Sequence, residues 1–131
     1  MDRLSLTLFV VSLSLASACG GGSTTGPSSG PNPKPTPTPG DVSIVQGAER
    51  LTTTAFDPNP KQLSLGGAAT VAVRWVNGDG ETHEIASDNQ AFATSSLLAS
   101  GATYSVTLAA GTYHYHCAIH PNMVGTIAVG P

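Results

Sequence analysis

Three side chains that bind soft metal ions lie close together near the end of the chain. Cys117, His120 and Met123 have the spacing C-x2-H-x2-M and follow the aromatic segment 113–116. A thiolate, an imidazole and a thioether are soft or borderline ligands, a set that suits copper in both of its oxidation states. A lone Cys or Met is most often a buried apolar residue. The joint spacing nevertheless predicts a site for one copper ion.

Such a site needs a second imidazole from elsewhere in the chain. His114 and His116 precede Cys117 at alternate positions, and successive side chains of a strand point to opposite faces. If Cys117 faces the metal, these two histidines face away from it. His83, which follows a turn-like segment, is therefore the predicted partner. Two His, one Cys and an axial Met form the ligand set of blue-copper electron-transfer sites. The predicted metal ligands are His83, Cys117, His120 and Met123.

Two further groups of polar residues lie near these ligands. We interpret His114 and His116 as solvated strand residues. The alternative is a surface patch that binds a second, weaker metal ion or contacts a partner. The segment 77–80, Asn-Gly-Asp-Gly, is interpreted as a turn without a further role.

The rest of residues 41–131 has the pattern of a β domain. Helical periodicity is nearly absent, and short runs of strand-like sequence are separated by Gly, Pro, Asn and Asp. The predicted strands are Val42–Gln46, Gln62–Leu65, Ala69–Val76, Thr82–Ala86, Thr103–Leu108, Thr112–Cys117 and Thr126–Val129. This many short strands in one small domain predict an all-β sandwich or a small barrel. Trp75, Phe92 and Tyr104 are expected in its core.

Residues 71–129 resemble cupredoxins of the plastocyanin and amicyanin type. The resemblance is carried by V-R-W-V-N-x-D-x-x-x-H, by F-x-T-S-S-L-L-x-x-G-x-T-Y-S-V-T-L and by Y-x-Y-x-C-x-x-H-P-x-M-x-G-x-I-x-V. The short gap between His120 and Met123, with Pro121 after the His, is closer to amicyanin. The resemblance implies a Greek-key β-sandwich of seven to eight strands, mononuclear copper and outer-sphere electron transfer. It also implies that electrons pass through His120, beside an apolar patch that would include Ile119, Pro121 and Val124.

Two residues depart from the family pattern. Glu84 follows the first His ligand, where Asn or Thr is usual and helps to tie the two ligand loops together. Ile119 stands where the family often has proline, and it leaves a backbone N–H free to donate to the Cys117 sulfur. Neither residue is a ligand. We expect both to affect the reduction potential and not the choice of metal.

The N-terminal third of the chain does not resemble a folded domain. Residues 1–18 predict a signal peptide, because a short apolar run ends in small residues. Cys19 follows directly, as in the lipobox of bacterial lipoproteins, and is the predicted lipidation site. Residues 19–40 are predicted to form a Gly/Ser/Thr- and Pro-rich linker, and residues 41–131 the cupredoxin domain. We therefore expect a protein of the periplasm or cell envelope, anchored by lipid to a membrane.

Composition and ligand count restrict the function further. The net charge of −3 argues against nucleic-acid binding, and each of the two cysteines has a predicted role other than a disulfide. Four protein ligands leave no open metal position for a substrate, so we expect no enzyme activity. The expected partners of this monomer are a protein electron donor and acceptor. The alternatives are copper delivery or sequestration, to which the low count of two methionines is poorly suited, and a purely structural sandwich.

Overall fold

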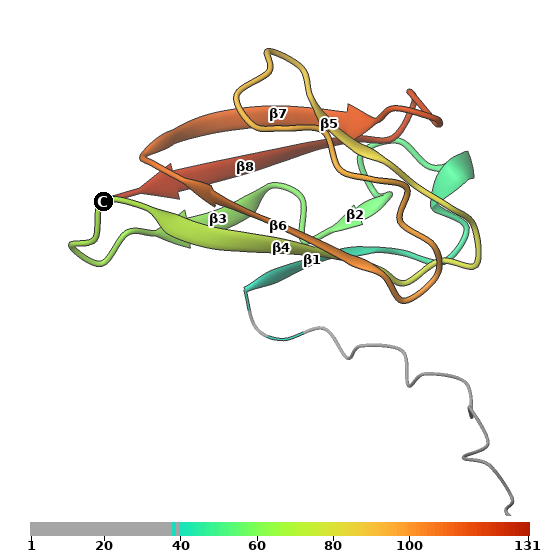
Figure 1. The fold of residues 1–131 in the computed structure, drawn as a ribbon, viewed down its shortest axis with the longest axis horizontal. Helices are drawn as coiled ribbons and strands as arrows, with labels where there is room; N and C mark the ends of the chain where they lie inside the picture. Colours follow the sequence, from blue (N-terminus) through green and yellow to red (C-terminus); the bar gives the residue numbers. More distant parts are fainter. Residues whose placement is uncertain (1–37, 39) are drawn as a thin grey trace, which may run out of the picture. The chain divides into compact units, whose positions relative to one another are not determined.

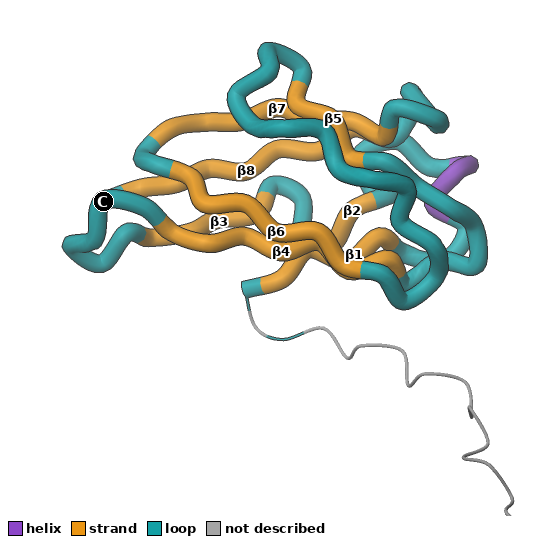
Figure 2. Tube along the Cα trace, in the orientation of Figure 1, coloured by secondary structure: helices purple, strands orange, loops and turns teal. Residues whose placement is uncertain are grey.

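The computed structural model describes residues 38 and 40–131. The predicted signal peptide, Cys19 and all but the end of the linker lie outside the described residues. Eight strands form two four-stranded sheets (Figures 1 and 2). The strands are β1 (Asp41–Ile44), β2 (Phe56–Asp57), β3 (Lys61–Ser64), β4 (Val71–Asn77), β5 (Ile85–Ser87), β6 (Thr103–Leu108), β7 (Gly111–Cys117) and β8 (Val124–Gly130). This confirms the predicted all-β sandwich.

The strand order brings segments that are distant in sequence next to one another. One sheet has the order β2-β1-β4-β6 and the other the order β3-β8-β7-β5. β1 pairs with β4 and β3 with β8 in parallel, and the remaining pairs are antiparallel. A 3-10 helix, η1 (Ala48–Arg50), interrupts the connection from β1 to β2. In the part of the chain that the structure describes, no helix has both the length and the apolar character needed to cross a membrane.

The core lies between the two sheets and is centred on aromatic rings. Trp75 of β4 and Tyr115 of β7 are fully buried, and their ring centroids are 5.2 Å apart. Phe92 and Tyr104 each lie 5.6 Å from Trp75 by ring centroids, but they are only partly buried at the edge of the core. The predicted core position is therefore confirmed for Trp75, and the other two rings pack against it from its margin.

Sheet pairing places the predicted ligands at one end of the sandwich. β7 ends at Cys117, and the antiparallel β8 begins at Val124, so the segment 118–123 connects neighbouring strands. Ile85 of β5 pairs with Cys117, which brings the preceding residues beside the same loop. β5 begins later than predicted because His83 pairs only with Leu98, in an isolated bridge.

Gly125 is required by the packing of Tyr115. A Cβ atom at Gly125 would lie 2.2 Å from Cζ of Tyr115 and 2.4 Å from its hydroxyl oxygen. The ring is also held by its neighbours, since it packs edge-on against Phe56 at 4.8 Å and against Trp75. We therefore expect Gly125→Ala to lower the free energy of unfolding by about 3 kcal/mol or more, as overpacking of a filled core does. Urea denaturation of the metal-free protein measures this loss.

Gly130 offers a matched control in the same strand. A Cβ atom there would meet only the carbonyl oxygen of Leu63, at 4.0 Å. Gly130→Ala should therefore change the free energy of unfolding by less than about 1 kcal/mol. Equal effects of the two substitutions would contradict the packing explanation.

Candidate metal centre

Three of the predicted ligand atoms converge at the end of β7. The Cys117 sulfur lies 3.7 Å from Nδ1 of His83 and 3.7 Å from Nδ1 of His120, and the two Nδ1 atoms are 3.3 Å apart. His83 and Cys117 are completely buried, whereas His120 is partly exposed. Among residues 38 and 40–131, this is the only group of three His, Cys or acidic residues whose ligand atoms all lie within 4.8 Å of one another.

The separations within this triangle fit a metal ion at its centre. With metal bonds of about 2.0 Å to nitrogen and about 2.3 Å to sulfur, a trigonal plane has N–N separations of about 3.5 Å and S–N separations of about 3.7 Å. The observed distances of 3.3 Å and 3.7 Å agree with that arrangement. A thiolate with two imidazoles is a donor set suited to copper. The three residues form a site for one copper ion.

Met123 belongs to the same turn. Its side chain is fully buried, its N–H donates to the His120 carbonyl at 2.9 Å, and its carbonyl accepts from the Cys117 N–H at 3.1 Å. The backbone of the loop therefore folds back on the end of β7, as the C-x2-H-x2-M spacing predicts.

Asp79 holds the ring of His83 from the side away from the sulfur. Its Oδ2 lies 3.1 Å from Nε2 of His83, and both side chains are buried. A carboxylate accepts at this position, so Nε2 carries the proton and Nδ1 presents its lone pair to Cys117 and His120. A carboxylate behind a metal-binding imidazole fixes both the orientation and the tautomer of the ring.

The Asp79 carboxylate is itself surrounded by donors. It accepts from Gln46 Nε2 at 2.7 Å and from the N–H groups of Gly47, Ala48 and Gly80 at 3.0, 3.2 and 2.7 Å. Burial acts to raise the pKa of Asp79, but the hydrogen bonds from Gly47, His83, Gly80 and Ala48 outweigh it and lower the pKa to about 2. This buried carboxylate is therefore ionised over the neutral range.

The interpretation of residues 77–80 as a turn without a further role was wrong. Asn77 is also fully buried: its Nδ2 donates to the carbonyls of Glu81 and Leu98, and its Oδ1 accepts from the Asp79 N–H. The segment forms a turn, but its two polar side chains hold His83 in place. The available sequence signal was the acid four residues before the histidine in N-x-D-x-x-x-H.

Backbone groups around Cys117 join the two ligand-bearing segments. The Glu84 N–H donates to the Cys117 sulfur at 3.4 Å, and the Ala118 N–H donates to the Glu84 carbonyl at 2.8 Å. The hydrogen bond to sulfur that was expected from Ile119 is not found in the described structure, and Glu84 supplies one instead. A donor to the thiolate is one of the features by which such a site sets its reduction potential.

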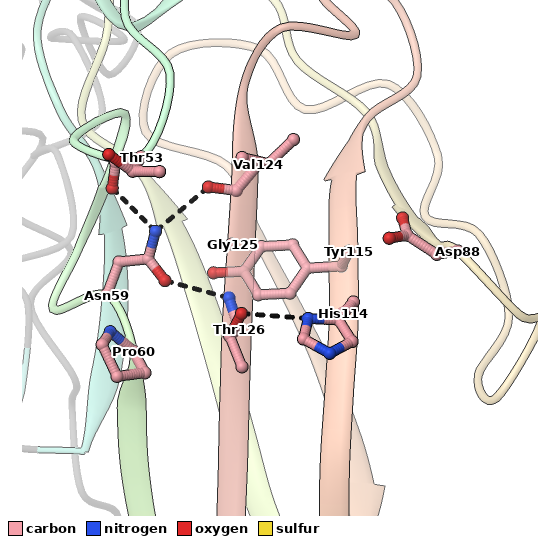
Figure 3. Close-up of a pocket in the computed structure, with 9 residues that line it drawn as sticks. All are labelled: Thr53, Asn59, Pro60, Asp88, His114, Tyr115, Val124, Gly125 and Thr126. Carbon is pink, nitrogen blue, oxygen red and sulfur yellow. Dashed lines mark hydrogen bonds between the residues drawn. The ribbon is translucent and has the colours of Figure 1, made fainter.

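His114 and His116 face away from the copper site, as strand alternation predicts. Nδ1 of His116 lies 2.6 Å from Oδ1 of Asp88. Nδ1 of His114 lies 3.1 Å from Oγ1 of Thr126, a contact drawn in Figure 3. His114 and Asp88 line a surface cavity of about 300 Å³ that includes none of the predicted metal ligands. Each imidazole thus has a different neighbour, and within the described part of the chain neither belongs to a group of three converging His, Cys or acidic side chains.

The exposed large apolar side chains lie beside the ligand-bearing segments. Ile119 is 44% exposed and precedes His120, Val124 is 37% exposed and follows Met123, and Leu97 is 63% exposed. Leu97 was not singled out from the sequence. It precedes Leu98, whose backbone pairs with that of His83 through hydrogen bonds of 2.7 and 3.1 Å. In the described part of the chain, the exposed large apolar side chains therefore lie next to the segments that carry the ligands.

Residues 44–129 match the family profile of the cupredoxin-like domain. The fold is similar to that of a purple cupredoxin from Nitrosopumilus maritimus, at 26% identity and a TM-score of 0.58, over 68% of this chain and 97% of that one. It is also similar to that of an amicyanin mutant in its reduced Cu(I) form, at 23% identity and a TM-score of 0.51, over 68% of this chain and 79% of that one. A copper-containing nitrite reductase from Thermus scotoductus SA-01 matches as well (26%, TM-score 0.53), over 72% of this chain and 23% of the enzyme. No curated protein sequence matches the chain.

Proposed function

This chain belongs to the cupredoxin family, and on that premise we propose that it is a type 1 copper protein that carries single electrons between protein partners outside the cytoplasm. The residues that would hold the copper ion are His83, Cys117 and His120, with Met123 as the fourth proposed ligand. The observation that carries the proposal is the triangle of Cys117 Sγ and two imidazole Nδ1 atoms, with edges of 3.7, 3.7 and 3.3 Å.

The bound ion supplies a one-electron Cu(I)/Cu(II) couple. The protein would contribute ligands whose positions are fixed by the fold. His83 is fixed by Asp79, Cys117 ends a strand of the sheet, and His120 lies in a short loop tied to that strand. Burial of His83 and Cys117 also keeps water from two of the donors. These features favour rapid electron transfer over substrate binding.

Partners would dock where His120 reaches the surface. Its partial exposure gives an electron the shortest protein path to the outside, and Leu97, Ile119 and Val124 provide an apolar surface nearby. Small, weak interfaces are typical of transient redox encounters. We call these three residues together with His120 the apolar docking surface.

The N-terminal residues support a location at a membrane surface outside the cytoplasm. We propose that residues 1–18 direct export, that Cys19 carries the lipid, and that residues 19–40 tether a monomeric domain formed by residues 41–131. A Pro-rich tether is a semi-rigid spacer that holds a domain away from its anchor. The low charge and the −3 balance do not favour nucleic acid as a partner.

We propose no catalytic role for this chain. The nitrite reductase similarity extends over only 23% of that enzyme. With Met123 as the fourth proposed ligand, the copper ion would have four protein ligands and no open position for a substrate.

Electron self-exchange between the Cu(I) and Cu(II) forms tests the function and the docking surface together. Two copies that meet through this surface would each bring an added charge to the contact. We therefore expect Ile119→Asp to slow self-exchange by about tenfold or more, since like charges across an interface cost several kcal/mol. The rate is measured from NMR line broadening, and the visible spectrum should be unchanged.

The matched control is Ala110→Asp, an exposed position in the turn between β6 and β7 at the opposite end of the sandwich (Figure 1). It adds the same charge and should leave the self-exchange rate within about twofold of the wild type. Equal slowing by both variants would mean that net charge, and not this surface, controls the encounter. A wild type that binds copper but does not exchange electrons would favour copper delivery or sequestration.

A further inference from the structure

We propose that residues 47–51, which include η1, form a brace that fixes the two ligand-bearing segments relative to each other. We further propose that Asn122 is the positioning residue that attaches the segment 118–123 to this brace. The inference rests on the copper ligands of the proposed function and adds a part of the chain that contains no ligand.

One side of the brace is attached to the first ligand. The N–H groups of Gly47 and Ala48 donate to the Asp79 carboxylate at 3.0 and 3.2 Å, and that carboxylate also contacts Nε2 of His83 at 3.1 Å. Asp79 is 1% exposed, so water does not compete for these contacts. The position of the His83 ring is therefore tied to the backbone at the start of η1.

The other side of the brace is attached to the second ligand-bearing segment. Nδ2 of Asn122 donates to the Leu51 carbonyl at 2.7 Å and to the Glu49 carbonyl at 3.2 Å. Asn122 lies between His120 and Met123, whose backbones are joined by a hydrogen bond of 2.9 Å. The Asn122 amide therefore anchors the middle of the turn that carries both of these ligands.

The brace is a single closed turn, so its two sides move together. The Leu51 N–H donates to the Ala48 carbonyl at 2.9 Å, and the Arg50 N–H donates to the Gly47 carbonyl at 3.2 Å. The backbone N–H groups of Glu84 and Ala118 also join the His83 segment directly to the end of β7. The side chains of Asp79 and Asn122 thus both form hydrogen bonds with the backbone of the brace.

Asn122→Ala in the full, copper-loaded chain tests this role. Loss of two hydrogen bonds should free the turn and speed copper release to a Cu(I) chelator by about tenfold, which corresponds to about 1.4 kcal/mol. The Cu(II) EPR spectrum should change, because the turn sets the positions of His120 and Met123. In the metal-free protein, hydrogen exchange of the Met123 amide should be about tenfold faster.

Asn59→Ala is the matched control. Its Nδ2 also donates to two carbonyls, of Thr53 at 2.7 Å and Val124 at 3.0 Å, and its Oδ1 accepts from the Thr126 N–H at 2.9 Å (Figure 3). These contacts join the loop residue Asn59 to Thr53 and to β8, and none of them involves the segment 118–123. The control should lower the free energy of unfolding at least as much as Asn122→Ala, and yet keep the EPR spectrum of the wild type.

The outcomes separate the brace from the proposed function. Equal copper release and unchanged EPR spectra in both variants would overturn the brace while leaving the copper function intact. A wild type without a copper–thiolate site would overturn the proposed function. In that case, the metal-free hydrogen exchange of Met123 still decides the brace: faster exchange in Asn122→Ala alone supports it, and equal exchange overturns it.

Discussion

Replacing Cys117 with Ser should remove the intense visible absorption that we expect of the copper-loaded protein. That band arises from charge transfer between a thiolate and Cu(II), and Cys117 is the single thiol among the three converging donors. Oxygen is a poorer ligand for Cu(I) than sulfur, so the variant should also lose Cu(I) affinity by at least about a hundredfold. Absorption spectroscopy and competition with a Cu(I) chelator measure the two effects.

The substitution is nearly isosteric, so the fold should survive it. Cys117 is fully buried at the end of β7, and the free energy of unfolding of the metal-free protein should fall by only about 1–2 kcal/mol. A Cys117→Ser variant that kept the band would show that another group provides the charge transfer. Cys19, which lies outside the described residues, is the other cysteine to examine in that case.

Asp79→Asn should weaken both the fold and the copper site. One carboxylate oxygen becomes an NH2 group. If this is Oδ2, Nε2 of His83 and the Ala48 N–H face a donor, and if it is Oδ1, the N–H groups of Gly47 and Gly80 do. Unsatisfied buried groups of this kind cost about 1–3 kcal/mol each. The free energy of unfolding of the metal-free protein should fall by about 3 kcal/mol. Copper affinity should fall by about 10–100-fold, since loss of the partner of a metal-binding His typically has that effect.

The same substitution should change how stability depends on pH. The pKa of Asp79 is lowered to about 2 in the folded protein, from the ordinary value of 3.8. A depressed carboxyl pKa stabilises the folded state above the unfolded pKa, and this stabilisation is lost as pH falls from about 4 towards 2. The shift corresponds to about 2 kcal/mol. Between about pH 4 and pH 2, the free energy of unfolding of Asp79→Asn should therefore fall by about this much less than that of the wild type. Urea denaturation of the metal-free protein at the two pH values measures the difference.

Asp41→Asn is the control for Asp79→Asn. Asp41 also has a lowered pKa, because hydrogen bonds from Arg74 outweigh the opposing effect of burial. It lies at the end of β1 away from the copper site, where Nε of Arg74 donates to it at 3.0 Å. This variant should lose acid-dependent stability but keep wild-type copper affinity. If both variants bound copper equally well, Asp79 would have no role in positioning His83.

The sequence was most informative where the chemistry is local. Cys117, His120 and Met123 lie within one strand end and one short turn, so their spacing alone predicts a common site. Strand alternation then correctly separates Cys117 from His114 and His116, because the period of two is a property of the extended backbone. His83 needed one further step of elimination, and the structure brings its Nδ1 to 3.7 Å from the thiolate.

The parts that could not be predicted depend on contacts between distant segments. In the sequence, Asp79 resembles an ordinary turn residue. Its role depends on hydrogen bonds from the N–H groups of Gly47 and Ala48, which lie more than thirty positions earlier in the chain. β2 contains only two residues and has no alternating pattern, so it forms because β1 provides an edge. Asn122 becomes recognisable only once η1 presents its carbonyls.

Copper K-edge X-ray absorption of the copper-loaded chain tests the central claim most directly. The proposed ligand set predicts one short Cu–S contact and two Cu–N contacts from imidazole. The short Cu–S contact should disappear in Cys117→Ser. A spectrum with only oxygen and nitrogen neighbours in the wild type would contradict the convergence of His83, Cys117 and His120 on one ion, and with it the electron-transfer function.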